Sequence, residues 1–226
     1  MSFKGFRFPK ELILLSVRGY LRYGLSYRNL EEMLEERGVL LAHTTIFHWV
    51  IRFTPLLVGA FTKKKAPVGG RWRMDETYIK VRGEDRYLYR AVDTNGDTVD
   101  FLFTARRDRH AARRFLEKAT KRHAPPSLIN IDKSGANKAG IEDFNDAQDA
   151  TGIEVRQCKY LNNLVEQDHR NIKRRVRPML GFKSFWTARI VLAGIELVHM
   201  LRKGQAALVV GQALVSDAET FYSLAT

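Results

Sequence analysis

The sequence has little cysteine and no long hydrophobic run. Its single cysteine, Cys158, excludes a disulfide framework within the chain and a zinc site built from several cysteines. Residues 1–10 are basic and aromatic and lack the apolar core of a signal peptide. The longest apolar stretch, residues 190–201, is interrupted by Glu196 and His199 and is too short to cross a bilayer. We therefore expect a cytoplasmic protein with no membrane-spanning segment.

Acidic residues are also scarce. The 226 residues include 25 Asp and Glu against 38 Lys and Arg, which gives a formal net charge of +13 and a pI near 10.0. The hydrophobic fraction of 45% is ordinary for a folded domain. A foldable chain with such an excess of positive charge indicates a polyanionic partner, with nucleic acid as the first candidate and an anionic membrane surface as the second. The alternative is a basic soluble protein without such a partner.

Residues 1–61 are typical of a small helical domain that binds DNA. Apolar residues recur at steps of three and four from residue 10 to 23, and Gly24 interrupts the pattern. A second helix begins after Ser26 as its N-cap, and a third begins near residue 44. This order predicts a helix-turn-helix domain, although a helical hairpin of another kind has the same pattern. Its last helix would offer four side chains to a DNA groove: Thr44, Thr45, His48 and Arg52.

Residues 62–71 are rich in lysine, proline and glycine and are interpreted as a linker. After the linker the hydrophobic period changes from about 3.6 to about 2. We assign residues 72–204 to a second domain and residues 205–226 to a C-terminal helical tail.

The second domain is predicted to be an α/β domain with a mixed five-stranded sheet flanked by helices. Three strands form an antiparallel meander over residues 72–81, 86–93 and 98–104, and Asn95-Gly96 favours a tight hairpin between the last two. Two further strands, 127–132 and 153–158, alternate with helices, which is typical of strands added in parallel. The expected helices span residues 108–122, 134–150, 163–177 and 184–203.

Asp75, Asp132 and Glu166 are the candidate metal ligands. Asp75 lies inside a strand of otherwise apolar and β-branched residues, where an unpaired carboxylate is costly. Asp132 ends a short buried strand, and Glu166 lies in the first turn of a later helix. If the strands of Asp75 and Asp132 are parallel neighbours, the three carboxylates can converge on a hard divalent cation such as Mg²⁺.

Each of these acids also has a purely structural interpretation. Asp75 could pair with Arg73 or Arg90 on a sheet face, and Asp132 could cap the next turn. Glu166 could close a capping box with Asn163. Four other acids compete for the same role: Glu76, Asp93, Glu142 and Asp143.

The helix of Glu166 favours the metal site over these alternatives. Glu166, Arg170, Lys173 and Arg177 recur at helical spacing on roughly one face, and Arg174 lies beside them. An acid followed by a row of cations suits a metal ion next to a phosphate backbone.

These motifs resemble those of the DDE transposases of small prokaryotic insertion sequences, in particular the insertion-sequence six family. The resemblance covers nearly the whole chain and depends on three motifs: Met74-Asp75-Glu76-Thr77-Tyr78, Ile131-Asp132-Lys133, and Asn163-x-Val165-Glu166-Gln167-Asp168-His169-Arg170-x-Ile172-Lys173. It implies an RNase H-like catalytic domain in which Asp75, Asp132 and Glu166 hold two Mg²⁺ ions, with Mn²⁺ as a substitute. It also implies that Lys173 contacts DNA.

The resemblance implies an enzyme that binds terminal inverted repeats, cleaves DNA strands and joins the freed 3′-hydroxyls to target DNA. We expect it to act near the nucleoid as a homodimer or a higher assembly on double-stranded DNA. Two other functions remain open at this point: an RNase H-like nuclease or phage-type integrase, and a non-catalytic DNA-binding regulator derived from a transposase.

Overall fold

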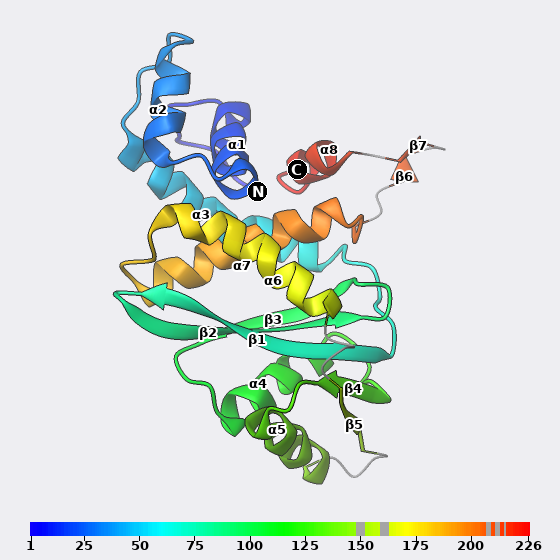
Figure 1. Ribbon diagram of the computed structural model, residues 1–226. Coiled ribbons are helices and arrows are strands. Elements are labelled where there is room, and N and C mark those ends of the chain that lie inside the picture. Colours follow the sequence, from blue (N-terminus) through cyan, green and yellow to red (C-terminus); the bar gives the residue numbers. More distant parts are fainter. Residues whose placement is uncertain (148–151, 159–162, 207–208, 211–212, 215) are drawn as a thin grey trace. The chain divides into compact units, whose positions relative to one another are not determined.

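The computed structural model describes residues 1–147, 152–158, 163–206, 209–210, 213–214 and 216–226 (Figure 1). The chain forms two compact units. One contains residues 1–66 and 172–226, and the other contains residues 67–171. These limits differ from the predicted domain boundaries, because the C-terminal quarter of the chain groups with the N-terminal helices.

The 67–171 unit is built on a five-stranded sheet in the order β3-β2-β1-β4-β5. The strand β1 (Arg71–Val81) pairs antiparallel with β2 (Glu84–Asp93), which pairs antiparallel with β3 (Thr98–Thr104). On the other side of β1, β4 (Leu128–Ile131) and β5 (Glu154–Gln157) continue the sheet in parallel. The predicted mixed sheet is confirmed, and this strand order is that of the RNase H fold.

The turn between β2 and β3 is organised by the buried carboxylate of Asp93. Its Oδ1 accepts hydrogen bonds from the backbone N–H groups of Asn95 and Asp97, each at 2.9 Å, and its Oδ2 accepts one from Gly69 at 2.8 Å. Gly96 supplies the left-handed conformation, with φ of +86°, that the predicted Asn-Gly turn requires. Asp93 therefore has a structural role, which removes it as a candidate metal ligand.

One face of the sheet carries the apolar core of this unit. The helices α4 (Arg109–Thr120) and α5 (Gly135–Asp146) lie on this face (Figure 1), and Phe115 and Ile141 pack there against Trp72 and Ile129. The predicted extension of the second helix to residue 150 lies outside the described residues.

The other unit begins with the predicted three helical segments. They are α1 (Lys10–Arg18), which continues as the π-helix η1 (Gly19–Tyr23), then α2 (Tyr27–Glu35) and α3 (His43–Thr62). Ser26 is the N-cap of α2, as predicted, because its side chain accepts a hydrogen bond from the backbone of Asn29 at 3.0 Å. The α3 helix is long and apolar enough to cross a membrane, but it buries Ile46, Trp49, Val50 and Phe53 in this unit.

The C-terminal segments complete this unit. The short helix η3 (Arg177–Met179) precedes α7 (Phe185–Arg202), and α7 packs against α3. Two short strands follow, β6 (Val209–Val210) and β7 (Ala213–Leu214), and then α8 (Asp217–Ser223). The prediction of a helical tail is therefore wrong for the β6–β7 hairpin and confirmed for α8. Small and β-branched residues dominate this part of the tail, and β-branched residues favour strands over helices.

Candidate catalytic site

Asp75 and Asp132 belong to neighbouring parallel strands. The register pairs Trp72 with Ile129 and Arg73 with Asn130. Two more residues along each strand bring the chain to Asp75 in β1 and to Asp132 immediately after β4. Because side chains alternate along a strand, residues that are in register on parallel neighbours face the same side. The predicted juxtaposition of these two strands is confirmed, and it places both acids on one face of the sheet.

This face is the one opposite the apolar core. Trp72 and Met74 point into the core with α4 and α5, so the alternate residues Arg73 and Asp75 point the other way. Arg90, which is paired with Asp75 in the β1–β2 register, faces the same side. The guanidinium of Arg73 donates a hydrogen bond to the backbone carbonyl of Asp93 at 3.2 Å. Arg90 forms an ion pair with Asp168.

The first part of the helix α6 (Asn163–Val176), which belongs to the same unit, lies against this face. Nη1 of Arg90 lies 3.0 Å from Oδ2 of Asp168, and both side chains are almost entirely buried, at 0% and 9% exposure. Nδ1 of the next residue, His169, lies 3.4 Å from Oδ2 of Asp75. Two adjacent residues of α6 therefore fix the helix on β1, which carries Asp75, and on β2, which carries Arg90.

Glu166 lies one helical turn before His169, on roughly the same side of α6. This spacing brings the third predicted acid to the part of the helix that faces Asp75. The helix begins at Asn163 and the residue before it lies outside the described residues, so the capping-box alternative for Glu166 stays a prediction.

Asp132 has a partial structural role. Its Oδ1 accepts a hydrogen bond from the backbone N–H of Ser134 at 2.9 Å, as the capping alternative predicted. Ser134 in turn is the N-cap of α5. This hydrogen bond fixes the carboxylate and uses one of its two oxygens.

Glu76 lies on the core side of the same strand and is strongly engaged. Its carboxylate accepts a hydrogen bond from the side chain of Asn137 at 2.7 Å and forms an ion pair with Arg107. Burial raises the pKa of Glu76, Asn137 and Arg107 oppose the increase, and the charges of Asp75 and Asp132 add to it. The carboxylates of Asp75 and Asp132 are thus close enough to act on the charge of Glu76.

Two other competing acids form ordinary ion pairs at the surface. Glu142 pairs with Lys138 at 3.6 Å, and Asp143 pairs with Arg109 at 3.6 Å. Both acids lie on α5, and their side chains are exposed or half-exposed.

The three predicted acids do not form a closed metal site. Within the described part of the chain, no group of three acidic, histidine or cysteine side chains is close enough to hold a metal ion. The structure brings Asp75 and Asp132 onto one face of the sheet and His169 of α6 against Asp75.

The predicted DNA-contact residues of α3 lie on its outer side. Thr44, His48 and Arg52 are exposed and follow one another at intervals of four, and Thr45 is half-buried. The guanidinium of Arg52 lies 5.0 Å from the ring centroid of Phe6. These side chains are available on one helical face, and their contact with DNA stays a prediction.

The cations of α6 and the turn after it are also accessible. Arg170, Arg174 and Arg177 are exposed, and Lys173 is half-buried. Their contact with DNA likewise stays a prediction.

The sequence interpretation missed His169 and the Arg90–Asp168 pair as parts of the site. A signal existed, because Asp168-His169 directly precedes the row of cations that begins at Arg170. Arg90, a cation inside an apolar strand, is a second signal of a buried partner.

Comparisons with known proteins identify the family of the chain. Residues 69–205 match the family described as "DDE domain" (DDE_Tnp_IS240). The transposase for the insertion sequence-like element IS431mec of Staphylococcus aureus is 39% identical over 198 residues, which are 87% of each protein. The transposase for the element IS257 in transposon Tn4003, also of Staphylococcus aureus, has the same identity and coverage.

A solved structure, the magnesium-bound catalytic core domain of HTLV-2 integrase, covers 70% of this chain and 98% of its own chain, with 16% identity and a TM-score of 0.45. The strand order β3-β2-β1-β4-β5 is the feature that identifies the fold. The family match and the identity to the two transposases show that the chain belongs to the insertion-sequence DDE transposases of the insertion-sequence six family.

Proposed function

We propose that this transposase cleaves DNA at terminal inverted repeats and transfers the freed 3′-hydroxyls to target DNA, with Asp75, Asp132 and Glu166 as the residues that hold two divalent ions. The observation that carries the proposal is the common face of Asp75 and Asp132, covered by the helix of Glu166.

The side chains fit Mg²⁺, with Mn²⁺ as a substitute. Carboxylate oxygens are the ligands that these hard cations prefer. The charges of Asp75 and Asp132 act unfavourably on the partly buried carboxylate of Glu76, and a nearby cation would relieve this repulsion. When bound, two divalent ions activate the attacking hydroxyl and stabilise the negative charge that develops at phosphorus.

The remaining contributions come from the chain itself. The hydrogen bond from the backbone N–H of Ser134 orients Asp132, and His169 lies against Asp75. The Arg90–Asp168 pair fixes the helix that carries Glu166. Along the same helix, Arg170, Lys173 and Arg174 supply positive charge for the phosphate backbone, with Arg177 just beyond its end, and the outer face of α3 supplies Thr44, Thr45, His48 and Arg52 for a DNA groove.

The test uses labelled terminal-repeat DNA and a plasmid target with Mg²⁺ or Mn²⁺. We expect Asp75→Asn, Asp132→Asn and Glu166→Gln each to reduce strand transfer at least about a thousandfold, or about 4 kcal/mol in activation free energy. The matched control is Glu142→Gln, which neutralises an exposed acid of α5 and should leave the rate unchanged.

Strand transfer that survives Asp75→Asn refutes the assignment of the site. Cleavage without joining in the wild-type protein favours the nuclease over the transposase reaction. Specific binding without cleavage favours the DNA-binding regulator.

A further inference from the structure

In the unit of residues 1–66 and 172–226, three arginines lie close enough to Arg175 for their charges to act on it. Arg22 lies in η1, Arg174 and Arg175 lie at the end of α6, and Arg202 is the last residue of α7. Residues that are far apart in the sequence are thus brought together by three different elements, which distinguishes the cluster from a run of charges along one solvated helix.

The glycine that follows η1 lies beside Arg175, at ordinary van der Waals distance. Gly24 has a left-handed backbone with φ of +69°, and a Cβ atom placed there would lie 3.5 Å from Nη1 of Arg175. The guanidinium of Arg175 therefore lies directly beside the segment that carries Arg22.

The charges in the cluster oppose one another. Partial burial lowers the pKa of Arg175, and the charges of Arg22, Arg202 and Arg174 lower it further. Every charged group that acts on Arg175 in this way is a cation. Like charges held together cost free energy unless an anion compensates them.

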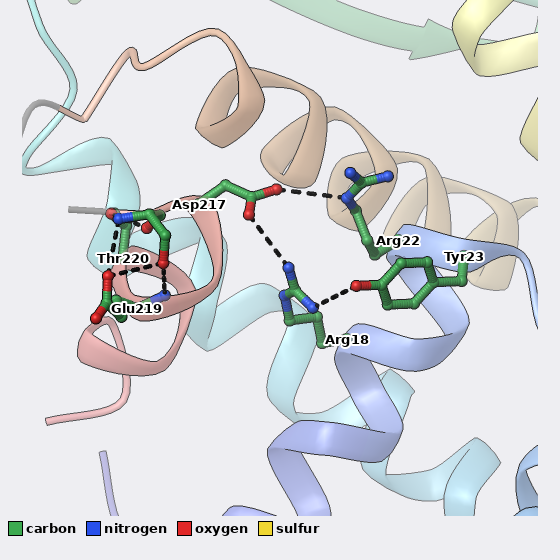
Figure 2. Close-up of polar contacts among 7 residues, drawn as sticks. Arg18, Arg22, Tyr23, Asp217, Glu219 and Thr220 are labelled. Atoms are coloured by element: carbon green, nitrogen blue, oxygen red, sulfur yellow. Dashed lines mark hydrogen bonds and ion pairs between the residues drawn. The ribbon is translucent and has the colours of Figure 1, made fainter. Parts of the chain in front are cut away.

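Asp217 of α8 supplies part of the compensation (Figure 2). Its Oδ1 lies 3.3 Å from Nη2 of Arg18, and its Oδ2 lies 3.4 Å from Nε of Arg22. Arg18 also donates to the hydroxyl of Tyr23 at 3.0 Å. One half-buried carboxylate is thus shared between two arginines at distances longer than those of a strong charge-assisted hydrogen bond.

The start of α8 holds Asp217 in this position. The side chain of Ser216 accepts a hydrogen bond from the backbone N–H of Glu219 at 3.1 Å, and Glu219 accepts one from the backbone N–H of Ser216 at 2.9 Å (Figure 2). This capping box fixes the first turn of the helix, in which Asp217 is the first residue.

We propose that Arg22, Arg175 and Arg202 form a binding site for the phosphates of a DNA backbone, and that Asp217 is an internal counter-ion that competes with these phosphates. The site is separate from the face of α3 that carries Thr44, His48 and Arg52. It rests on the proposed function only in taking DNA as the polyanion. Arginine suits the role because its planar guanidinium binds phosphate oxygens in pairs and keeps its charge when partly buried.

The experiment measures binding of the full-length protein to a fluorescent duplex of random sequence, without divalent metal, over a range of salt concentrations. Arg22→Gln, Arg175→Gln and Arg202→Gln should each weaken binding at low salt. For each lost phosphate contact, the slope of log K against log salt should fall in magnitude by about 0.9. The matched control is Arg37→Gln, which removes the same charge from an exposed arginine that is paired with Glu36 and should leave the slope unchanged.

For a fourth variant, the expected change in DNA affinity has the opposite sign. Asp217→Asn keeps the size of the side chain and releases Arg18 and Arg22, so it should tighten DNA binding and steepen the salt dependence. Circular dichroism and thermal melting check that all variants are folded.

The proposal is overturned if the three cluster variants have the same salt slope as Arg37→Gln, or if Asp217→Asn weakens binding in a folded protein. This outcome is distinguishable from failure of the proposed function. The proposed function is tested by strand transfer in the wild-type protein and its loss in Asp75→Asn, and neither result depends on the salt dependence of DNA binding. Conversely, a protein that joins no DNA can still show the predicted slopes.

Discussion

Nδ1 of His169 lies 3.4 Å from Oδ2 of Asp75, and the residue before it, Asp168, forms a buried ion pair with Arg90. In the β1–β2 register Arg90 is the partner of Asp75. Two neighbouring residues of α6 therefore contact two paired residues of the sheet. These two contacts hold the helix that carries Glu166 against the proposed metal site, next to Asp75.

The contact between His169 and Asp75 should influence how tightly the site binds metal. A side chain that orients a metal ligand typically accounts for about 10–100-fold in metal affinity or activity. We expect His169→Ala to raise by such a factor the Mg²⁺ concentration that gives half-maximal strand transfer. The control, Gln167→Ala, changes an exposed neighbour on the same helix and should leave the metal requirement as it is. A normal metal requirement in His169→Ala would show that His169 does not position Asp75.

Removal of one partner of the Arg90–Asp168 ion pair should destabilise the fold strongly, whereas replacement of both partners by apolar residues should destabilise it little. Arg90→Met leaves the carboxylate of Asp168 buried without this partner, which should lower the free energy of unfolding by about 3–5 kcal/mol. The double variant Arg90→Met with Asp168→Leu removes both charges and should recover most of that loss. Urea denaturation, monitored by circular dichroism, measures the free energy of unfolding of the single and the double variant.

A surface pair provides the comparison for this prediction. Nζ of Lys80 lies 2.8 Å from Oδ1 of Asp85, both on exposed side chains. Because water screens this pair, Lys80→Gln should lower the free energy of unfolding far less than Arg90→Met. Equal losses in Lys80→Gln and Arg90→Met would contradict a special role for the buried pair.

The capping box of α8 should make a pH-dependent contribution to stability. Hydrogen bonds from the backbone and the side chain of Ser216 lower the pKa of Glu219 below its usual range. A carboxylate whose pKa is lowered by folding stabilises the protein above its unfolded pKa, near 4.3, and this contribution disappears as the pH falls through the folded pKa. We therefore expect Glu219→Gln to lower the melting temperature at pH 7 and to melt like the wild-type protein near pH 2. A difference between the two proteins that is the same at both pH values would contradict this linkage.

The fold and the placement of Asp75 and Asp132 on neighbouring strands could be predicted from the sequence because their signals are local. Alternating apolar residues and the Asn95-Gly96 turn define the meander, and a buried strand that ends in Asp132 is readily placed beside β1. Ser26 is recognisable as an N-cap because its side chain is close in sequence to the backbone groups it binds.

The partners of the buried charges could not be predicted in the same way. Arg90 and Asp168 are 78 positions apart, and nothing in the β2 strand identifies which acid neutralises its arginine. The docking of α8 through Asp217 onto Arg18 and Arg22 connects opposite ends of the chain, and short-range patterns do not contain such contacts.

The packing of α5 against α4 depends on the absence of a side chain at Gly140. A Cβ atom placed there would lie 2.5 Å from Cβ of Ala112 and 2.7 Å from the backbone carbonyl oxygen of Arg109. Because one of these neighbours is backbone, a rotamer change cannot remove the clash, and the two helices must move apart.

We therefore expect Gly140→Ala to lower the free energy of unfolding by about 2 kcal/mol, although alanine is the better helix former. The matched control is Gly59→Ala in α3, where a Cβ atom would meet nothing within 4 Å. Relief of the glycine's entropic cost should stabilise this variant by about 0.5–1 kcal/mol. Urea midpoints at unchanged m-value measure both effects, and because the two substitutions are chemically identical, opposite signs can arise only from the space around each glycine. A Gly140→Ala protein that is as stable as Gly59→Ala would show that α4 and α5 are not in the close contact described above.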